Sequence, residues 1–324
     1  MCIRDSMKIA SVDIGTNAVK SKIFKTTPAS IKYIDGIRSP IRLGAEVFKK
    51  GKLSEKKLKE LIHTLKKYQI KFIKDKVDQY EIVATSALRN TSNSEEARRY
   101  IENKIEHPIR IISGLEEAQL ISFHPKAQQE KNKMFVDVGG GSTEIYIYKN
   151  SNHSFQSFQL GGVRLMLKKD EKKEWDRLDK WLNQFTDIKE IIGLGGNIRA
   201  FLSAHKLKKM KSDDFLKKYK NLRNLEIEEK INKYGFANDR ADVIDFALKI
   251  YERIIKKLDI KTIQSTKWGV SDSIAVKIFH EIYSYFRKLL EQNKNFNNLL
   301  ENYKKILIIM SPLFHIFQAN ACKT

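Results

Sequence analysis

The stretch that decides the fold is "FVDVGGGSTEIYIY", residues 135–148. Aromatic and β-branched residues on both sides of the glycines are typical of two strands joined by a tight turn. Each ordered glycine costs backbone entropy, and a plain hairpin needs only one or two, so three in a row need a reason. One interpretation is a loose turn. The other is a turn that a ligand approaches too closely for any Cβ, with successive N–H groups forming an anion-binding nest.

An earlier segment repeats the same plan. Residues 8–24 read "KIASVDIGTNAVKSKIF", again a β-rich run that ends at an aspartate, a glycine turn and a second β-rich run. The repetition predicts two similar domains. The polar stretch "HPKAQQEKNK", residues 124–133, is the expected boundary. We therefore expect an N-terminal domain over 7–125 and a C-terminal domain over 126–324.

The rest of the chain alternates between strand-like and helix-like segments, which is typical of an α/β protein. Glycine, proline and asparagine separate most of these segments. Strands are predicted within 30–43, 80–90, 108–113, 154–160 and 188–196, and helices within 54–69, 93–105, 163–170, 172–185, 197–206, 238–257 and 271–300.

The composition excludes several classes of protein. No run approaches the roughly 18–20 apolar residues of a membrane span, although 41% of the 324 residues are hydrophobic. Cys2 and Cys322 are the only cysteines, so neither a disulfide framework nor a cysteine metal site is expected. "MCIRDS" is short and polar, and Met7 is the expected true start. We expect a soluble, cytoplasmic protein.

The charge is strongly basic. Sixty-one Lys and Arg against 39 Asp and Glu give a formal net charge of +22. Such an excess favours a polyanionic partner. The alternative is that lysines cover solvated helix faces, as in "SEKKLKELIHTLKKY", residues 54–68. No basic patch is interleaved with aromatic residues, so nucleic acid is not expected as a partner.

Several motifs occur together in one order, and the chain resembles the exopolyphosphatase/guanosine pentaphosphate phosphohydrolase (Ppx/GppA) family from about Lys8 to about Ile278. This family has two ribonuclease-H-like, actin-like domains that face each other across a cleft. The resemblance implies hydrolysis of the terminal phosphoanhydride of polyphosphate or guanosine pentaphosphate by a short, two-domain form. The motifs are "VATSALRNTSN" (83–93), "IRIISGLEEAQLI" (109–121), "FVDVGGGSTEI" (135–145), "LGGVRL" (160–165) and "IGLGGNIRAF" (192–201).

The two glycine turns are the expected phosphate cradle. Their backbone amides could hold successive phosphates from opposite sides of a cleft, and their hydroxyls add donors. Arg89 resembles the phosphate-contacting arginine of the family, and its planar fork suits bidentate phosphate binding. The expected phosphate-binding residues are Gly15, Thr16, Asn17, Arg89, Gly139, Gly140, Gly141, Ser142 and Thr143.

Carboxylates at the strand ends would repel phosphate unless a cation lay between them. Mg²⁺ or another divalent cation is the natural mediator, because hard cations prefer oxygen ligands. The resemblance implies that Asp137 and Glu144 lie on the metal side, and Asp13 is the expected third ligand. The alternative for each aspartate is a turn cap with Asx hydrogen bonds.

The general base is expected in "SGLEEA", residues 113–118. Glu117 aligns with the catalytic glutamate of the family, and Glu116 is its neighbour. A carboxylate within hydrogen-bond reach of a water can orient and deprotonate it. The alternative is that both glutamates enrich the first turn of a helix, where the macrodipole favours acidic residues.

Other functions were weighed. An actin-like kinase or ATPase would use the same turns on ATP and would take adenosine at "GLGGNIRAF", residues 193–201. A non-catalytic polyphosphate-binding protein would not need these acidic residues. Ala18 departs from the serine of many relatives, and the tail from 307 onwards matches nothing in the family. The candidate oligomeric state is a homodimer. The sequence does not show whether polyphosphate or guanosine pentaphosphate is the preferred substrate.

Overall fold

The computed structural model describes residues 6–127, 133–149 and 151–292. The expectations about Cys2, Cys322, the six residues before Met7 (apart from Ser6) and the C-terminal tail lie outside these ranges. Among the described residues, no helix is both long enough and apolar enough to cross a membrane.

The first half of the chain builds a five-stranded sheet. Its strands are β1 (Met7–Ile14), β2 (Val19–Thr27), β3 (Ser30–Ser39), β4 (Gln79–Ala84) and β5 (Ile109–Ile111). They lie in the order β3-β2-β1-β4-β5. Strand β2 is antiparallel to both of its neighbours, β1 and β3, while β4 and β5 are parallel to β1. The helical segments are α1 (Leu43–Lys50), α2 (Glu55–Lys74), α3 (Ser86–Arg89), α4 (Ser94–Ile105), α5 (Gly114–Leu120) and the 3₁₀ turn η1 (Ile121–Phe123).

The second half builds a six-stranded sheet. Its strands are β6 (Lys133–Val138), β7 (Thr143–Lys149), β8 (Asn152–Phe158), β9 (Glu190–Leu194), β10 (Lys209–Lys211) and β11 (Thr262–Ser265), in the order β10-β11-β9-β6-β7-β8. The helices are α6 (Gly162–Met166), α7 (Lys172–Leu182), α8 (Gly196–Ala204), α9 (Ser212–Leu222), α10 (Ile227–Tyr234), α11 (Asn238–Ala241), α12 (Ile244–Leu258) and α13 (Val270–Gln292).

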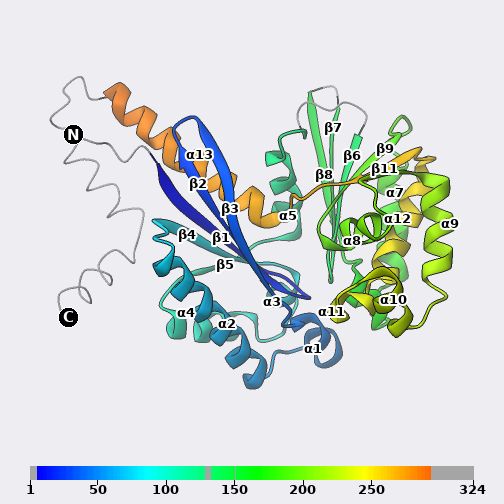
Figure 1. The fold of residues 1–324 in the computed structure, drawn as a ribbon, viewed down its shortest axis with the longest axis horizontal. Coiled ribbons are helices and arrows are strands. Elements are labelled where there is room, and N and C mark those ends of the chain that lie inside the picture. The colour runs from blue at the N-terminus through cyan, green and yellow to red at the C-terminus, as the bar shows by residue number, and fades with distance from the viewer. Residues whose placement is uncertain (1–5, 128–132, 150, 293–324) are drawn as a thin grey trace.

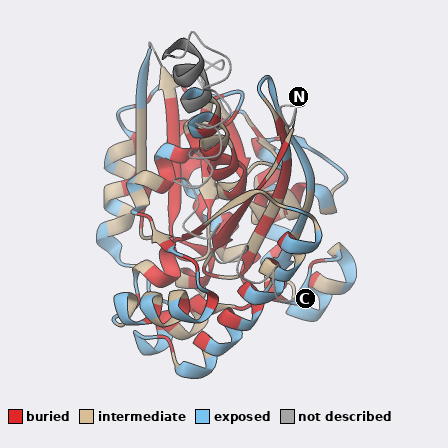
Figure 2. Ribbon diagram, turned by 90° about the vertical axis from the view of Figure 1, so that its left-hand side faces the viewer, coloured by how far each residue is buried: buried red, intermediate tan, exposed pale blue. Residues whose placement is uncertain are grey.

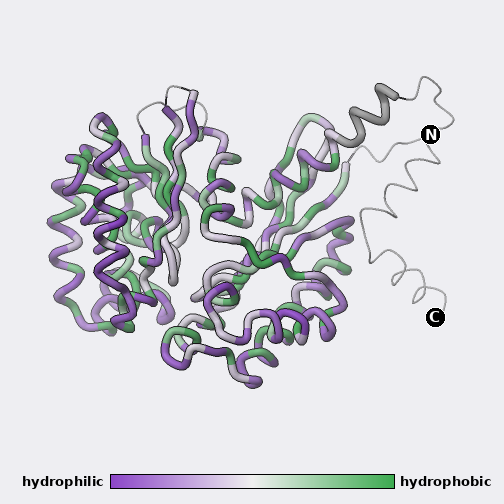
Figure 3. The backbone as a smooth tube through the Cα atoms, turned by 180° about the vertical axis from the view of Figure 1, so that it is seen from behind, coloured by the Kyte–Doolittle hydropathy of each residue, from purple (hydrophilic) through white to green (hydrophobic). Residues whose placement is uncertain are grey.

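The two sheets repeat one plan, as Figure 1 shows. In each, an antiparallel hairpin leads to a third antiparallel strand, and a later strand returns parallel to the first. The predicted α/β class and the predicted internal repeat are confirmed. The strands are largely buried, while the outer faces of the helices are exposed (Figure 2) and hydrophilic (Figure 3).

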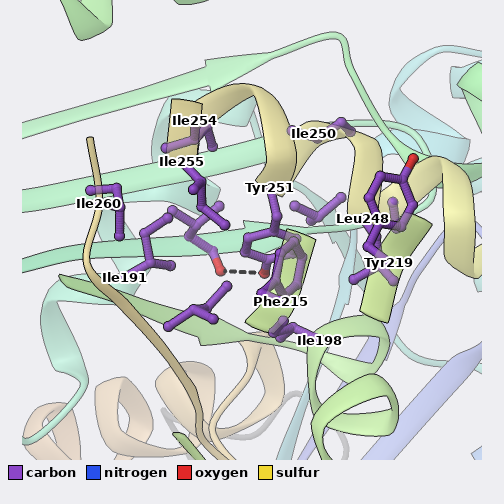
Figure 4. Packing of buried hydrophobic residues seen from close by; sticks show 14 of the residues in the cluster. Ile191, Ile198, Phe215, Tyr219, Leu248, Ile250, Tyr251, Ile254, Ile255 and Ile260 are labelled. Carbon is purple, nitrogen blue, oxygen red and sulfur yellow. Dashed lines mark hydrogen bonds between the residues drawn. The ribbon is translucent and has the colours of Figure 1, made fainter. Parts of the chain in front are cut away.

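The second sheet is anchored by packing against α12. Hydrophobic residues of α12 recur every three or four positions, which gives one apolar helix face. Tyr251 lies at its centre, and its hydroxyl donates to the Val136 carbonyl at 3.0 Å (Figure 4). This bond satisfies a fully buried hydroxyl and fixes α12 against β6, the strand that ends at Asp137.

Helix α13 returns to the first sheet. Its residues Ile274 and Ile278 are buried in one cluster with Met7, Ile9 and Phe24. Figure 1 shows this helix beside β2, and its first residues also face the second sheet, because Val270 and Ser273 line a small cavity with Asp137 and Glu144. The boundary near residue 126 stays a prediction, and α13 packs on the first sheet although it falls in the range 126–324.

Several local predictions need correction. The segment 238–257 is not one helix, because α11 ends at Ala241 and α12 begins at Ile244. The strand expected over 30–43 ends at Ser39, and α1 follows. The loop expected after β4 contains α3. The short strands β10 and β11 and the helices α1, α9 and α10 were not predicted.

Candidate functional site

The two glycine turns have the same backbone geometry. In the first turn (residues 15–18), Gly15 N donates to Ala18 O at 3.2 Å. In the second turn (residues 139–142), Gly139 N donates to Ser142 O at 3.0 Å. Each turn follows a strand whose second-to-last residue is its aspartate, Asp13 on β1 or Asp137 on β6.

The carbonyl oxygens of both turns are held by the start of a nearby helix, α1 for the first turn and α6 for the second. Unpaired N–H groups at a helix start bind these carbonyls, so each turn is fixed on one side. The bonds are Arg42 N to Asn17 O (2.9 Å), Gly44 N to Thr16 O (2.8 Å), Gly162 N to Gly139 O (3.0 Å) and Val163 N to Gly140 O (2.8 Å).

The amides on the other side of the turns are free. Six backbone N–H groups of the two turns donate to no protein acceptor among the described residues, and all six residues line one cavity. Buried N–H groups are normally paired, so successive unpaired amides of this kind could bind an anion. The residues are Thr16, Asn17, Ala18, Gly140, Gly141 and Ser142.

The cavity between the turns has a volume of about 90 Å³. On this measure one water needs about 10–15 Å³, so the cavity holds a group of several heavy atoms, such as a phosphate. Four carboxylates line it together with the turns: Asp13, Glu117, Asp137 and Glu144. A second cavity of about 10 Å³, large enough for one water, lies behind it beside the last three.

Two of the three consecutive glycines, Gly140 and Gly141, are explained by close packing between the two halves. None of them has φ in the left-handed region. A Cβ on Gly140 would lie 2.8 Å from Thr16 Cγ2 of the first turn, and one on Gly141 would overlap the Ser86 side chain. A Cβ on Gly139 would meet only Ser142 O, at 3.2 Å. What approaches these glycines in this structure is therefore protein from the other half.

Glu117 is held at the cavity by α5. Ser113 caps this helix, since its hydroxyl accepts from Glu116 N at 3.1 Å. Arg89 donates to Glu117 Oε2 at 3.2 Å and to the Ile112 carbonyl at 2.8 Å. Burial raises the pKa of Glu117 to about 7, against the lowering effect of Arg89, and Asp13 raises it further.

The neighbouring glutamate lies in a different environment. Glu116 forms an ion pair with Arg110, and its side chain is 38% exposed. It does not line the cavity. The structure therefore separates the two glutamates of "SGLEEA" as the sequence-based prediction requires, with Glu117 inside and Glu116 outside.

The three predicted metal ligands all line the cavity. Asp13 pairs with Lys20 at 3.4 Å, and Glu144 accepts from the Ser157 hydroxyl at 2.8 Å. Burial raises the pKa of Asp137 to about 6, and it raises the pKa of Glu144 well above its usual value. Buried carboxylates with raised pKa values are stabilised by a nearby cation.

The donor set fits a metal ion that is shared with substrate. Among the described residues, no group of three or more acidic, histidine or cysteine side chains is arranged to hold a metal ion by itself. Mg²⁺ commonly takes one or two carboxylates and completes its shell with waters and substrate phosphates. Hard carboxylate oxygens beside a phosphate-sized cavity meet that requirement.

Two predicted phosphate-binding residues lie away from the cavity. The Thr143 hydroxyl donates to Leu160 O at 2.6 Å, and Thr143 is fully buried. The Arg89 guanidinium donates hydrogen bonds to Glu117 and to the Ile112 carbonyl, and it lies 3.5 Å from Ser142 Oγ. By contrast, Thr16 Oγ1 is buried at the cavity without a hydrogen-bond partner.

Sequence reasoning missed two arginines at the cavity. Arg38 comes from β3 and Arg240 from α11. Burial lowers the pKa of Arg240 to about 10, and its guanidinium fills the space beside Gly196. No motif marks either arginine, since each reaches the cavity only through long-range packing.

Comparisons with known proteins agree with this geometry. The chain resembles a solved Ppx/GppA family member from Aquifex aeolicus, at 22% identity over 90% of this chain and 100% of that one, with a TM-score of 0.66. It also resembles an exopolyphosphatase from Cytophaga hutchinsonii, at 21% identity over 85% of this chain and 98% of that one, with a TM-score of 0.76. These likenesses show that the chain shares the fold of those two proteins, in agreement with the predicted α/β class. The Ppx/GppA phosphatase family profile matches residues 22–281, and the chain therefore belongs to that phosphatase family.

Proposed function

We propose that this phosphatase hydrolyses the terminal phosphoanhydride of inorganic polyphosphate or guanosine pentaphosphate. The observation that carries the proposal is the pair of matching turns whose free amides surround a phosphate-sized cavity beside the buried Glu117. Phosphoryl transfer needs little covalent help from a protein, so positioning and electrostatics supply most of the catalysis.

The turns hold the terminal phosphates. The free amides of the first turn and of the second turn bind phosphate oxygens from opposite sides, and the unpaired Thr16 hydroxyl donates to the same group. Charge-assisted hydrogen bonds of this kind are about twice as strong as neutral ones. Because helices fix the turn carbonyls, the amides are preorganised and lose little freedom on binding.

Glu117 acts as the general base. Its Oε2 is oriented by Arg89, and a Glu117 oxygen accepts the proton of the water that attacks the terminal phosphorus. The P–O bond to the remaining chain breaks, and the shortened chain leaves with its oxygen charge. With a pKa raised to about 7, Glu117 is a much stronger base than an exposed glutamate.

Asp137 and Glu144, with Asp13 across the cavity, are the residues that would hold a divalent cation such as Mg²⁺. A bound Mg²⁺ would neutralise the phosphate oxygens in the transition state. Without a positive charge, these carboxylates and Glu117 would repel the substrate from the same cavity.

The kinase alternative finds no support at its expected nucleotide site. It would place adenosine at the turn that contains Gly196, and the Arg240 guanidinium occupies the space beside that residue. A non-catalytic binding protein would have no use for a buried, arginine-oriented Glu117.

The test is phosphate release from a purified preparation, with polyphosphate, guanosine pentaphosphate and ATP compared in Mg²⁺ and in excess chelator. We expect release from at least one of the first two substrates, little from ATP, and loss of release in chelator. Absence of release from both phosphoanhydride substrates with Mg²⁺ present would overturn the proposal. Full activity in chelator would refute only the proposed role of the metal ion.

A further inference from the structure

Helix α11 contacts the first half of the chain through Asp239. The Asp239 carboxylate is bound by both terminal nitrogens of Arg38. Asn17 Nδ2 donates to the Asp239 carbonyl at 2.6 Å and to Asp239 Oδ2 at 3.1 Å. One aspartate thus joins the second domain to both β3 and the first turn.

The partners of Asp239 are themselves cavity residues. Arg38 and Asn17 both line the cavity, and the Asp239 side chain is only 11% exposed. Burial alone would raise the pKa of Asp239, but the hydrogen bond from Arg38 and the charges of Arg240 and Arg42 lower it below its usual value. The Asp239 side chain is therefore an ionised carboxylate at neutral pH.

A neighbouring ion pair joins the same two segments outside the cavity. Arg42 pairs with Asp242, and neither residue lines the cavity. Of these two aspartates, only Asp239 places its charge on groups that line the cavity and that an entering anion could use. A phosphate presents the same oxygen geometry to a planar guanidinium as a carboxylate does.

We propose that Asp239 is an internal anion that occupies Arg38 and Asn17 at the cavity, and that a substrate phosphate displaces it. The proposal rests on the phosphoanhydride substrate proposed above. The cavity, about 90 Å³, has room for roughly one phosphate, so a longer chain must extend beyond its lining. Substrate then exchanges one charge-assisted contact for another and leaves α11 free to move.

The experiment compares wild type with Asp239→Asn on polyphosphate. The amide keeps the shape and removes the charge that competes for Arg38. Because a closed state lowers apparent affinity by the fraction of open protein, we expect the KM to fall about threefold to tenfold. The kcat should change less than twofold. An unchanged or higher KM would overturn the proposal.

The control is Asp242→Asn, which breaks the neighbouring pair outside the cavity. We expect its KM to stay within twofold of wild type. If both variants lower the KM equally, general loosening of α11 explains the effect and the competition is refuted.

A double-mutant cycle tests the partner directly. Arg38→Gln should raise the KM, and Asp239→Asn should have little further effect in that background, because the group over which the two anions compete is gone. An undiminished effect of Asp239→Asn in the Arg38→Gln background would contradict the proposal.

Hydrogen exchange separates this inference from the proposed function, because it needs no turnover. With tripolyphosphate and Mg²⁺, the amides of the second turn should exchange more slowly, while those of α11 exchange faster. Slower exchange in both segments would refute displacement of Asp239. No change at the second turn, together with no phosphate release, would instead refute the proposed function on which the inference rests.

Discussion

The two glycine turns share a backbone but differ in the charges beside them. Asp13 at the first turn has a cation from its own hairpin, Lys20, at 3.4 Å. Asp137 at the second turn has no ion pair among the described residues, and burial raises its pKa to about 6. The first turn is thus balanced by the chain itself. The second turn, with Glu144 next to it on β7, has no such ion pair in the part of the chain that the structure describes, although the charges of Lys20 and Arg199 lower the pKa of Asp137. In the proposed function, an external cation balances this turn.

The largest effect should come from the residue between the turns. Glu117→Gln keeps the size of the side chain and its place beside Arg89, but it cannot take a proton. We expect kcat to fall ~10²–10⁴-fold with KM nearly unchanged, as for loss of a general base. Steady-state phosphate release measures this. Glu116→Gln is the matched control and should change kcat less than twofold.

The comparison of the turns is sharpened by two asparagine variants. Asp137→Asn should lower kcat/KM at limiting Mg²⁺ by at least roughly 10–100-fold, the cost of losing even an outer partner of a metal ligand. Asp13→Asn should cost less, because Lys20 already offsets its charge. Activity measured across a Mg²⁺ titration decides the order, and equal losses would mean that the turns share the cation evenly.

A smaller effect is expected from the packing between the turns. Gly140→Ala places a methyl group 2.8 Å from Thr16 Cγ2, so we expect overpacking of about 1–3 kcal/mol and a kcat/KM about tenfold lower. Gly139→Ala, whose methyl group meets only Ser142 O, is the control. Melting curves and phosphate release are measured on the same preparations. Equal behaviour of the two variants would show that close approach of the turns is not what Gly140 serves.

The last expected effect, which does not involve catalysis, is on stability as a function of pH. The pKa of Glu117 is about 7 in the folded protein against an ordinary 4.5, so the folded state holds its proton more tightly. Its contribution to stability is present below about pH 4.5 and is lost as pH rises through 7. Relative to wild type, Glu117→Gln should gain up to about 3 kcal/mol of unfolding free energy between pH 5 and 8. Denaturant titrations without metal measure it, with Glu116→Gln expected to show no such trend.

The sequence predicted what local chemistry controls. The hairpins at 8–24 and 134–148 follow from β-rich runs broken by an aspartate and glycines, and α2 follows from Ser54, which accepts from Lys57 N, and from its buried leucines. The cavity gathers Asp13, Glu117 and Asp137, which the motifs had singled out. These features depend on residues close together in the chain.

The rest depends on contacts between distant segments. Arg38 and Asp239 are 201 residues apart, and no sequence pattern near either residue predicts their contact. The short strand β10 pairs with β11 through only three residues, too few for a clear alternating pattern. The reason for Gly140 also lay outside its own hairpin, because the atom that excludes a Cβ belongs to Thr16.

The most direct test of the account is the pH dependence of kcat/KM for wild type and Glu117→Gln at saturating Mg²⁺. We expect kcat/KM of the wild type to rise with pH through about 7, as the buried Glu117 loses its proton. In Glu117→Gln that rise should vanish. A wild-type profile that is flat through 7, or the same rise in Glu117→Gln, would contradict the assignment of Glu117 as the base between the two turns.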